Sequence, residues 1–164
     1  MSKSKKTLIY SLSIVVVIIV GLLIFGLTKV KVYSVNGPSM KPTLTNGQKV
    51  IAVKGTLNIY RGDIVIFKEK NAQYISRVIG LPGDQVVIKD GTVTIFNQAS
   101  PKGFNPDRGQ SYLTKNEKTA GNINLKLTIN QYFGLGDNRS NSLDSRDYGP
   151  ITKSSIIATD ARVE

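Results

Sequence analysis

The sequence predicts a mostly β fold preceded by one transmembrane helix. Near the start of the 164-residue chain lies a long run without a charged side chain, residues 7–28. After it, short runs rich in β-branched residues alternate with Asn-Gly, Asp-Gly and Pro-Gly turn signals, which is the pattern of antiparallel strands. The length is enough for one domain plus an anchor but not for two full cores. We therefore expect a single β-rich domain over residues 32–164.

Residues 7–28, TLIYSLSIVVVIIVGLLIFGLT, are predicted to span a cell membrane once. At a rise of ~1.5 Å per residue, this helix crosses a hydrocarbon core ~30 Å thick. A cleaved signal peptide is the alternative, but its apolar run is normally ~7–15 residues and ends at a small-x-small site, which LIFGLTKVKV does not offer. Three lysines precede the run and two follow it. This slight bias predicts that residues 1–6 are cytoplasmic and the domain extracytoplasmic.

Several segments of the domain are predicted strands. KVIAVKG and DIVIFK are rich in β-branched residues, and QVVIKDGTVTIF places Asp90-Gly91 between two alternating runs, as in a two-residue hairpin. The strand that contains ISRVIG ends at LPGD, residues 81–84, which suits a type II turn. QYFGLGDN is a further strand that runs into a turn. Residues 98–124 are polar without periodicity, and we expect a mobile insertion or a small subdomain there.

Charge and composition exclude several functions. Residues 1–31 hold five lysines and no acid, which leaves +6 of the net +11 for the rest of the chain. There the basic residues are scattered among acids, without the basic stripe and stacking aromatics of a nucleic-acid groove. We expect no nucleic-acid partner, and we interpret the positive charge as a feature that favours contact with membrane lipid. Cysteine and histidine are absent, which removes thiol catalysis, the usual base of serine hydrolases and the commonest zinc ligand. No metal or organic cofactor is implied.

Two stretches carry the candidate chemistry. Ser39 lies in VNGPSMKPTL, where prolines exclude regular helix and a glycine permits unusual backbone angles, so its hydroxyl can be held exposed. Taken alone, a loop leading out of the membrane is the favoured interpretation. The second stretch, GDNRSNSLDSRDYGP, concentrates aspartates and arginines after an apolar strand. Solvated loop charges are one interpretation, but because arginine cannot act as a base we prefer structural clamps, formed by Asp137, Arg139, Asp144 and Arg146. The last two would face the same way in an extended chain.

The order of the sequence blocks resembles that of a type I signal peptidase. After the apolar run come SMKPTL, RGDIVIFK, RVIGLPGD and GDNRSNSLDSR, which together cover nearly the whole chain. The small Gram-positive form with a single amino-terminal anchor is the most similar. Soluble self-cleaving repressors share a Ser-Lys dyad, but the predicted anchor argues against them. The resemblance implies a β-rich catalytic domain at the outer face of a membrane, which cleaves signal peptides from exported precursor proteins.

The resemblance also implies roles for individual residues. Ser39 would be the nucleophile, its backbone N–H would contribute to the oxyanion hole, and Met40 would help shape the substrate site. Ser142 would orient the general base. Gly37 stands where some relatives have an oxyanion-hole hydroxyl, so that contribution would be missing. The structural ion pair of the family falls on Asp144 and Arg146.

Ser76 departs from the family pattern. It occupies the position of the general-base lysine, immediately before RVIGLPGD. A serine hydroxyl is far less basic than a buried neutral amine, and Arg77 stays protonated. Lys54, Lys68 and Lys70 are candidate replacements, although nothing in the sequence places one of them within ~3 Å of the nucleophile.

Three explanations are consistent with this departure. The chain is a natural non-catalytic homologue, an enzyme with a relocated base, or a protein whose lysine was replaced to trap a substrate. Two functional hypotheses follow. The first is a membrane-bound serine endopeptidase with an impaired or altered base, and the second is a non-catalytic homologue that binds exported or surface-protein segments as an assembly factor.

Overall fold

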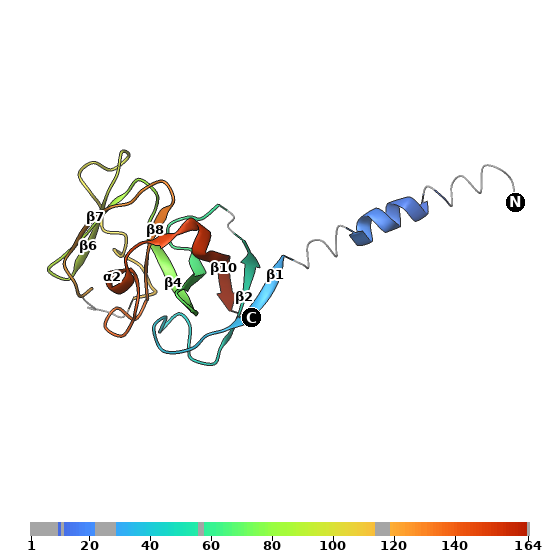
Figure 1. The fold of residues 1–164 in the computed structure, drawn as a ribbon, viewed down its shortest axis with the longest axis horizontal. Coiled ribbons are helices and arrows are strands. Elements are labelled where there is room, and N and C mark those ends of the chain that lie inside the picture. The colour runs from blue at the N-terminus through green and yellow to red at the C-terminus, as the bar shows by residue number, and fades with distance from the viewer. Residues whose placement is uncertain (1–9, 11, 22–28, 56–57, 114–118, 164) are drawn as a thin grey trace, which may run out of the picture.

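Two antiparallel sheets form the domain (Figure 1). The computed structural model describes residues 10, 12–21, 29–55, 58–113 and 119–163. The strands are β1 (Val30–Ser34), β2 (Lys49–Lys54), β3 (Ile64–Glu69), β4 (Ala72–Gly80), β5 (Gln85–Lys89), β6 (Thr92–Phe96), β7 (Ile123–Lys126), β8 (Gln131–Leu135), β9 (Ile151–Thr152) and β10 (Ile156–Val163). The larger sheet has the order β1-β2-β10-β3-β4-β8-β9 and the smaller one β6-β5-β7. The prediction of a mostly β fold is confirmed.

Short helices connect the last strands of the domain. The helix α2 (Ser145–Tyr148) follows β8, and a 3-10 turn, η1 (Lys153–Ser155), leads into β10. In Figure 1 the small sheet lies at the end of the domain opposite β1. The two sheets therefore lie toward different ends of the domain, and α2 contacts β8 of the larger one.

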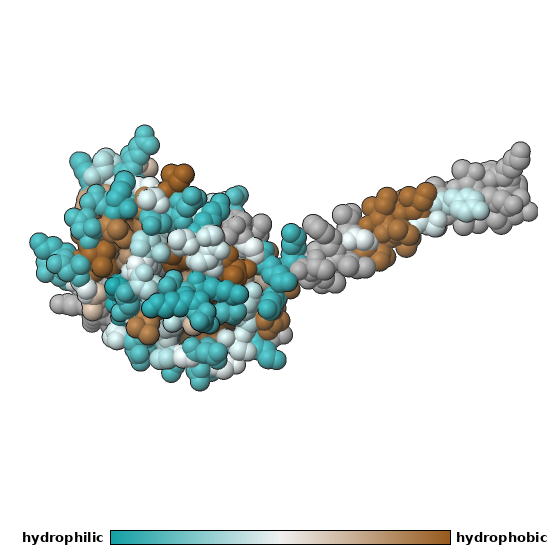
Figure 2. Space-filling view, in the orientation of Figure 1, coloured by the Kyte–Doolittle hydropathy of each residue, from teal (hydrophilic) through white to brown (hydrophobic). Residues whose placement is uncertain are grey.

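The predicted membrane span falls partly outside the described residues. Residues 10 and 12–21 are helical and exposed, and Figure 2 shows the apolar surface of this helix. Residues 7–9, 11 and 22–28 of the predicted span lie outside the part that the structure describes. Within that part, no helix is long and apolar enough to cross a membrane. The spanning helix therefore finds no support there.

The predicted strands and turns are present. KVIAVKG and DIVIFK form β2 and β3, and β5 pairs with β6 around Asp90 and Gly91. These two residues have φ of 50° and 80°, as the tight two-residue hairpin requires. β4 ends at Gly80, and the turn after it is closed by the N–H of Asp84, which donates to the carbonyl of Leu81 at 3.0 Å. The local turn signals thus predicted the chain reversals correctly.

Other parts of the fold differ from the prediction. β1 begins at Val30, two residues before the expected start of the domain, and β10 was not expected. β10 has a register shift between Thr159 and Arg162, and such an irregularity breaks the alternation that reveals a strand. β7 begins at Ile123, so the last two residues of the segment 98–124 lie in a strand.

Buried apolar clusters cover both faces of the larger sheet. Neighbouring residues of β3 point to opposite faces, so Ile66 belongs to one cluster and Phe67 to another. The first cluster includes Met40 and Leu44 from the loop between β1 and β2. Phe133 and the strands of the small sheet share a third cluster, which joins the two sheets. The loop that carries Ser39 is therefore anchored in the core through its neighbour Met40.

Candidate active site

Ser39 is held in a fixed loop between β1 and β2. Met40 is fully buried beneath it. From the loop after β8, the backbone N–H of Asn138 donates to the carbonyl of Ser39 at 2.9 Å, and its side-chain amide donates to the carbonyl of Pro38 at 3.1 Å. Ser39 itself is half-buried. The sequence analysis did not identify Asn138, whose role depends on this contact across the fold.

Gly37 fixes the turn before Ser39. Its φ is 95°, in the left-handed region where glycine is favoured. Its N–H donates to the side-chain oxygen of Asn46 at 2.8 Å. The position therefore has a structural use that suits glycine, and it offers no side chain to a substrate.

A cavity of about 180 Å³ opens beside Ser39. Its residues come from β1 to β4 and the loop between β1 and β2: Tyr33, Ser34, Asn36, Ser39, Val50, Ile66, Gln73, Tyr74 and Ile75. This lining combines apolar side chains with a few polar groups, as binding sites commonly do.

Two glycines bring the three predicted site serines together. A Cβ built on Gly136 would lie 2.1 Å from Ser142 Oγ and 2.6 Å from the carbonyl oxygen of Ser39. A Cβ built on Gly134 would lie 3.1 Å from the Cβ of Ser76. Gly134 lies in β8 and Gly136 just beyond its end, and we refer to these two residues as the glycine strip. Ser142 and the carbonyl of Ser39 fill the space beside Gly136, whereas Ile151 Cδ1, 2.6 Å from the built Cβ, and Ser76 fill it beside Gly134.

The hydroxyls of Ser76 and Ser142 are buried and unpaired. Ser76 is 0% exposed, and neither Oγ has a hydrogen-bond partner in the described part of the chain. An unpaired buried hydroxyl costs roughly 1–3 kcal/mol, so two of them in one place call for an explanation. The family resemblance implies that a lysine at position 76 would supply Ser142 with a hydrogen-bond partner.

The phenol of Tyr148 borders Ser76. Burial raises the pKa of Tyr148, the negative charge of Asp144 raises it further, and the Ser76 hydroxyl lowers it to a smaller extent. The contact with Ser76 does not meet the geometry of a hydrogen bond, and the phenol donates instead to the carbonyl of Leu143 at 2.9 Å. Tyr148 therefore stays protonated at neutral pH and cannot act as the missing base.

The lysines proposed as replacement bases do not lie in the site. Lys54, Lys68 and Lys70 are exposed, as is every other described lysine. None of the three is among the residues that line the cavity with Ser39. A general base must come within ~3 Å of the proton it removes. Within the described ranges the structure provides no lysine in that position.

Asp137 clamps the loop after β8 to β4. Both carboxylate oxygens accept from Arg77, at 2.8 and 2.7 Å, and one also accepts from the hydroxyl of Thr43. Asp137 is 0% exposed. Because Arg77 directly follows Ser76, this ion pair fixes the backbone next to the base position. The contact joins the loop after β8 to β4.

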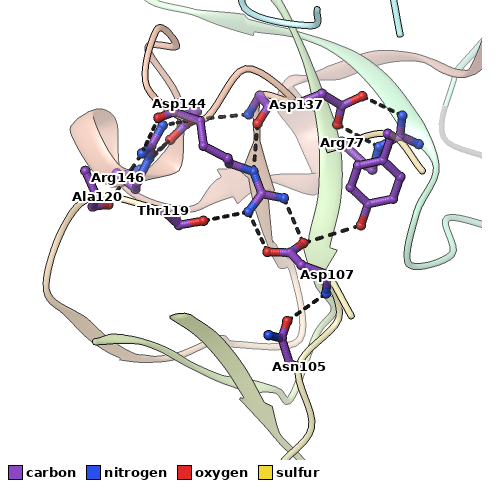
Figure 3. Close-up of polar contacts among 11 residues, drawn as sticks. Arg77, Asn105, Asp107, Thr119, Ala120, Asp137, Asp144 and Arg146 are labelled. Atoms are coloured by element: carbon purple, nitrogen blue, oxygen red, sulfur yellow. Dashed lines mark hydrogen bonds and ion pairs between the residues drawn. The ribbon is translucent and has the colours of Figure 1, made fainter. Parts of the chain in front are cut away.

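Arg139 pairs with Asp107 of the polar insertion rather than with an acid of its own block. Figure 3 labels Asp107 and Thr119, two of the partners of Arg139. Its guanidinium donates to the two carboxylate oxygens at 2.6 and 2.8 Å and to the hydroxyl of Thr119 at 2.8 Å. Its Nε donates to the carbonyl of Gly136 at 2.9 Å. The insertion is therefore fastened to the glycine strip. Asp107 was not predicted as a partner of Arg139, because the block GDNRSNSLDSR itself contains two aspartates for its two arginines.

Asp144 and Arg146 form an ion pair, but not in an extended chain. Both oxygens of Asp144 accept from the Arg146 guanidinium at 2.8 Å. Asp144 also caps α2, in a capping box with Asp147. A further hydrogen bond of 3.0 Å joins the N–H of Gly136 to Asp144 Oδ2. The extended geometry predicted for this pair is wrong, because the cap starts a short helix.

Tyr112 connects two of these ion pairs. The Arg77 guanidinium lies 4.1 Å from its ring centroid, and its hydroxyl donates to Asp107 at 3.4 Å. Burial and the charge of Asp107 raise the pKa of Tyr112 to about 12, against the opposing effects of Arg139 and Arg77. The neutral phenol is therefore part of the packed network between the insertion and the site.

Alkaline stability should depend on Tyr112. Its pKa in the folded protein is about 12 and its ordinary value is 10.0. Above the ordinary pKa the unfolded chain loses this proton first, so the stability that Tyr112 contributes is complete below that pKa and is lost as the pH rises through the folded value. The urea midpoint of unfolding should fall as the pH rises above 10, and we expect this fall to be shallower in Tyr112→Phe. Some fall should remain, because the pKa of Tyr148 is raised as well. The exposed Tyr60→Phe is the matched control, and equal slopes in all three proteins would contradict the prediction.

Known proteins resemble this chain over most of its length. A family model described as "Signal peptidase, peptidase S26" matches residues 7–163. Signal peptidase I P from Bacillus subtilis subsp. natto is 38% identical over 146 residues, covering 80% of this chain and 75% of that protein. Signal peptidase I S from Bacillus subtilis (strain 168) is 36% identical over 172 residues, covering 96% and 89%. Signal peptidase IB from Staphylococcus aureus is 34% identical over 166 residues, covering 93% and 87%.

A solved structure is also similar. The crystal structure of a signal peptidase I from Enterococcus faecalis V583 has a TM-score of 0.48 and 27% sequence identity to this chain. The match covers 61% of this chain and 94% of that one.

Proposed function

Because the chain belongs to the signal peptidase family, peptidase S26, we propose that it is a membrane-anchored signal peptidase with an impaired catalytic base. The family acts on the signal peptides of precursor proteins. One observation carries the proposal: Ser39 lies beside an open cavity, in contact with the glycine strip that also borders Ser76 and Ser142. These contacts support a nucleophile site at Ser39, while position 76 holds a hydroxyl.

In this proposal each site residue has a defined task. The precursor lies extended across the cavity, and Ser39 Oγ attacks the carbonyl carbon of the scissile peptide. The N–H of Ser39 donates to the oxyanion that forms, without a side-chain donor from Gly37. Met40 shapes the floor of the site from below, and Ser142 is positioned to orient an amine. No step requires a metal or an organic cofactor.

The weak point of this mechanism is proton removal. Ser39 must lose its proton as it attacks, and Ser76 cannot accept it at neutral pH. A positioned base contributes roughly 10²–10⁴-fold in rate. We therefore expect cleavage that is slower than that of a lysine-containing enzyme by about this factor, with the residual rate coming from binding and the oxyanion hole.

We also propose that residues 7–28 anchor the protein in the cell membrane, with residues 1–6 cytoplasmic and the domain extracytoplasmic. The family model begins at residue 7, and the run has no charged residue. The flanking lysines would lie near lipid headgroups. This arrangement would place the cavity at the membrane surface, where a precursor emerges.

Cleavage of a signal-peptide precursor by the full chain in detergent tests the proposal. We expect slow appearance of the mature product on a denaturing gel, and loss of that product in Ser39→Ala. A folded preparation that binds the precursor without cleaving it would contradict the catalytic proposal. Product formed equally by Ser39→Ala would exclude Ser39 as the nucleophile.

The alternative is a non-catalytic homologue that binds exported or surface-protein segments. The observation that favours it is the exposure of every described lysine, which leaves the cavity intact without a base beside it. Fluorescence anisotropy of a labelled signal peptide against the full chain measures this binding. Saturable binding with no cleavage on long incubation would support the alternative, and a lack of binding would contradict it.

A further inference from the structure

Asn138 holds the backbone on both sides of the Ser39 Cα. Its side-chain amide donates to the carbonyl of Pro38 at 3.1 Å, and its backbone N–H donates to the carbonyl of Ser39 at 2.9 Å. The N–H of Lys41 donates to the same Pro38 carbonyl at 3.0 Å. Because a carbonyl oxygen has two lone pairs, these two donors occupy the Pro38 oxygen. The peptide unit that joins Pro38 to Ser39 is therefore held from its carbonyl side.

These contacts also set the direction of the Ser39 N–H. A trans peptide unit is planar, and its C=O and N–H bonds point in opposite directions. The hydrogen bond from Lys41 to Pro38 closes a turn whose central residues, Ser39 and Met40, both have φ outside the left-handed region. The turn is therefore type I, with helical backbone angles. The first N–H groups of a helical turn have no acceptor within it, so the Ser39 N–H points away from the turn.

The Ser39 N–H is an available donor beside the cavity. It donates to no acceptor in the ranges that the structure describes, and Ser39 is half-buried and lines the cavity. A donor that is fixed in direction and has no partner suits an oxygen that gains negative charge during a reaction. Hydrogen bonds to the carbonyl of a peptide unit also polarise its N–H, which strengthens this donor.

Buried ion pairs on both sides hold Asn138 in place. Its chain neighbours, Asp137 and Arg139, have side chains that are 0% exposed, and each is joined to an oppositely charged partner. A shift of the backbone at Asn138 would therefore disturb both pairs. The hydroxyl of Ser140 donates to Asn138 Oδ1 at 3.3 Å, so the oxygen end of the amide is used and the Nδ2 end is directed at Pro38.

We propose that Asn138 is a positioning residue that aligns the Ser39 N–H with the oxyanion formed during signal-peptide cleavage. This inference rests on the proposed function. Asn138 acts through the peptide unit between Pro38 and Ser39, so it does not need to touch the substrate. The alignment matters in this chain because Gly37 offers no side-chain donor, which leaves the oxyanion dependent on the backbone.

Asn138→Asp is the variant that tests this role. It keeps the size of the side chain and replaces the N–H donors with a carboxylate oxygen, which only accepts. The backbone N–H of residue 138 can still hold the Ser39 carbonyl. Asn124→Asp is the matched control, because Asn124 is exposed on the small sheet and its Oδ1 accepts from Gln85 at 2.8 Å, a contact that a carboxylate can keep. Both variants add one negative charge, but only the first loses the donor to Pro38.

The experiment measures kcat and KM for precursor cleavage in detergent, with the full chain and Ser76→Lys as the two parent proteins. In each parent that cleaves, we expect Asn138→Asp to lower kcat by about tenfold or more, since losing an oxyanion donor costs ~10²–10³-fold. KM should stay within about twofold, because the aligned donor acts in the transition state. Asn124→Asp should match its parent in both constants. An unchanged kcat, a loss in KM alone, or an equal loss in Asn124→Asp would overturn the proposal.

The amide signal of Ser39 tests the same contact by spectroscopy. In the full chain labelled with ¹⁵N-serine, the signal that is missing from Ser39→Ala identifies Ser39, and the other serine signals show whether a variant is folded. The ¹⁵N shift of a residue responds to hydrogen bonds on the preceding carbonyl, so it should move in Asn138→Asp and stay in place in Asn124→Asp. An unmoved signal in Asn138→Asp would overturn the proposal.

The two parent proteins separate this inference from the proposed function. If a parent cleaves and its Asn138→Asp variant cleaves equally fast, the inference is wrong and the proposed function stands. If neither folded parent cleaves, the proposed function fails, and the inference that rests on it fails as well.

Discussion

Replacing Ser76 with lysine should raise the rate of precursor cleavage by about 10²–10⁴-fold. The lysine stem would start beside Gly134, between that glycine and the side chain of Ile151, and its amine would offer a donor to the unpaired hydroxyl of Ser142. Burial beside Tyr148 disfavours the charged amine, so its pKa falls and the neutral base becomes available. Ser142 then gains the donor that it lacks in this chain.

Ser76→Arg is the matched control for this substitution. Arginine has a similar reach but stays protonated in proteins, so it should leave the rate unchanged. The double variant Ser76→Lys with Ser39→Ala should be inactive. The measurement is the rate of product formation from one precursor, with every variant at the same concentration. Equal activity of the lysine and arginine variants would show that the amine does not act as a base.

Arg139→Leu should lower the free energy of unfolding by about 3–5 kcal/mol. Its side chain is 0% exposed and Asp107 is 11% exposed, so removing the guanidinium leaves a largely buried carboxylate without its partner. The hydroxyl of Thr119 and the carbonyl of Gly136 lose a donor as well. Urea unfolding followed by circular dichroism measures the change.

Arg162→Leu provides the comparison for this prediction. Arg162 also pairs with an aspartate, Asp160, at 2.8 Å, but the two side chains are 77% and 47% exposed. Exposed pairs of this kind contribute little, so this variant should unfold at nearly the original urea concentration. The double variant Asp107→Leu with Arg139→Leu should be less destabilised than Arg139→Leu alone, because no unpaired charge remains. Equal losses for Arg139→Leu and Arg162→Leu would contradict the role of burial.

Local patterns in the sequence were enough to predict much of the fold. The hairpin at Asp90-Gly91 and the turn after Gly80 depend on residues that are neighbours in the chain, and both are confirmed. Strands with regular alternation were predicted for the same reason. β10 escaped prediction because its register shift breaks that alternation.

The candidate site was predicted from motifs, and its supporting contacts were not. Ser39, Ser76 and Ser142 were identified by resemblance, and the structure places them around the same two glycines. Asp107 lies 32 residues from Arg139, and Tyr148 reaches Ser76 only through the fold. No local pattern links such pairs. The spacing of the two glycines in FGLG was the available signal, since it leaves one face of a strand without side chains.

The place of β10 has a consequence for the order in which the site forms during synthesis. β10 lies between β2 and β3, although it follows every other strand in the chain. Until residues 156–163 are present, the larger sheet consists of two separate pieces, β1-β2 and β3-β4-β8-β9. Ser39 belongs to the first piece, and Ser76 and Ser142 belong to the second. A nascent chain that ends before β10 would therefore contain all three serines, but it would lack the strand that joins the two pieces of the sheet.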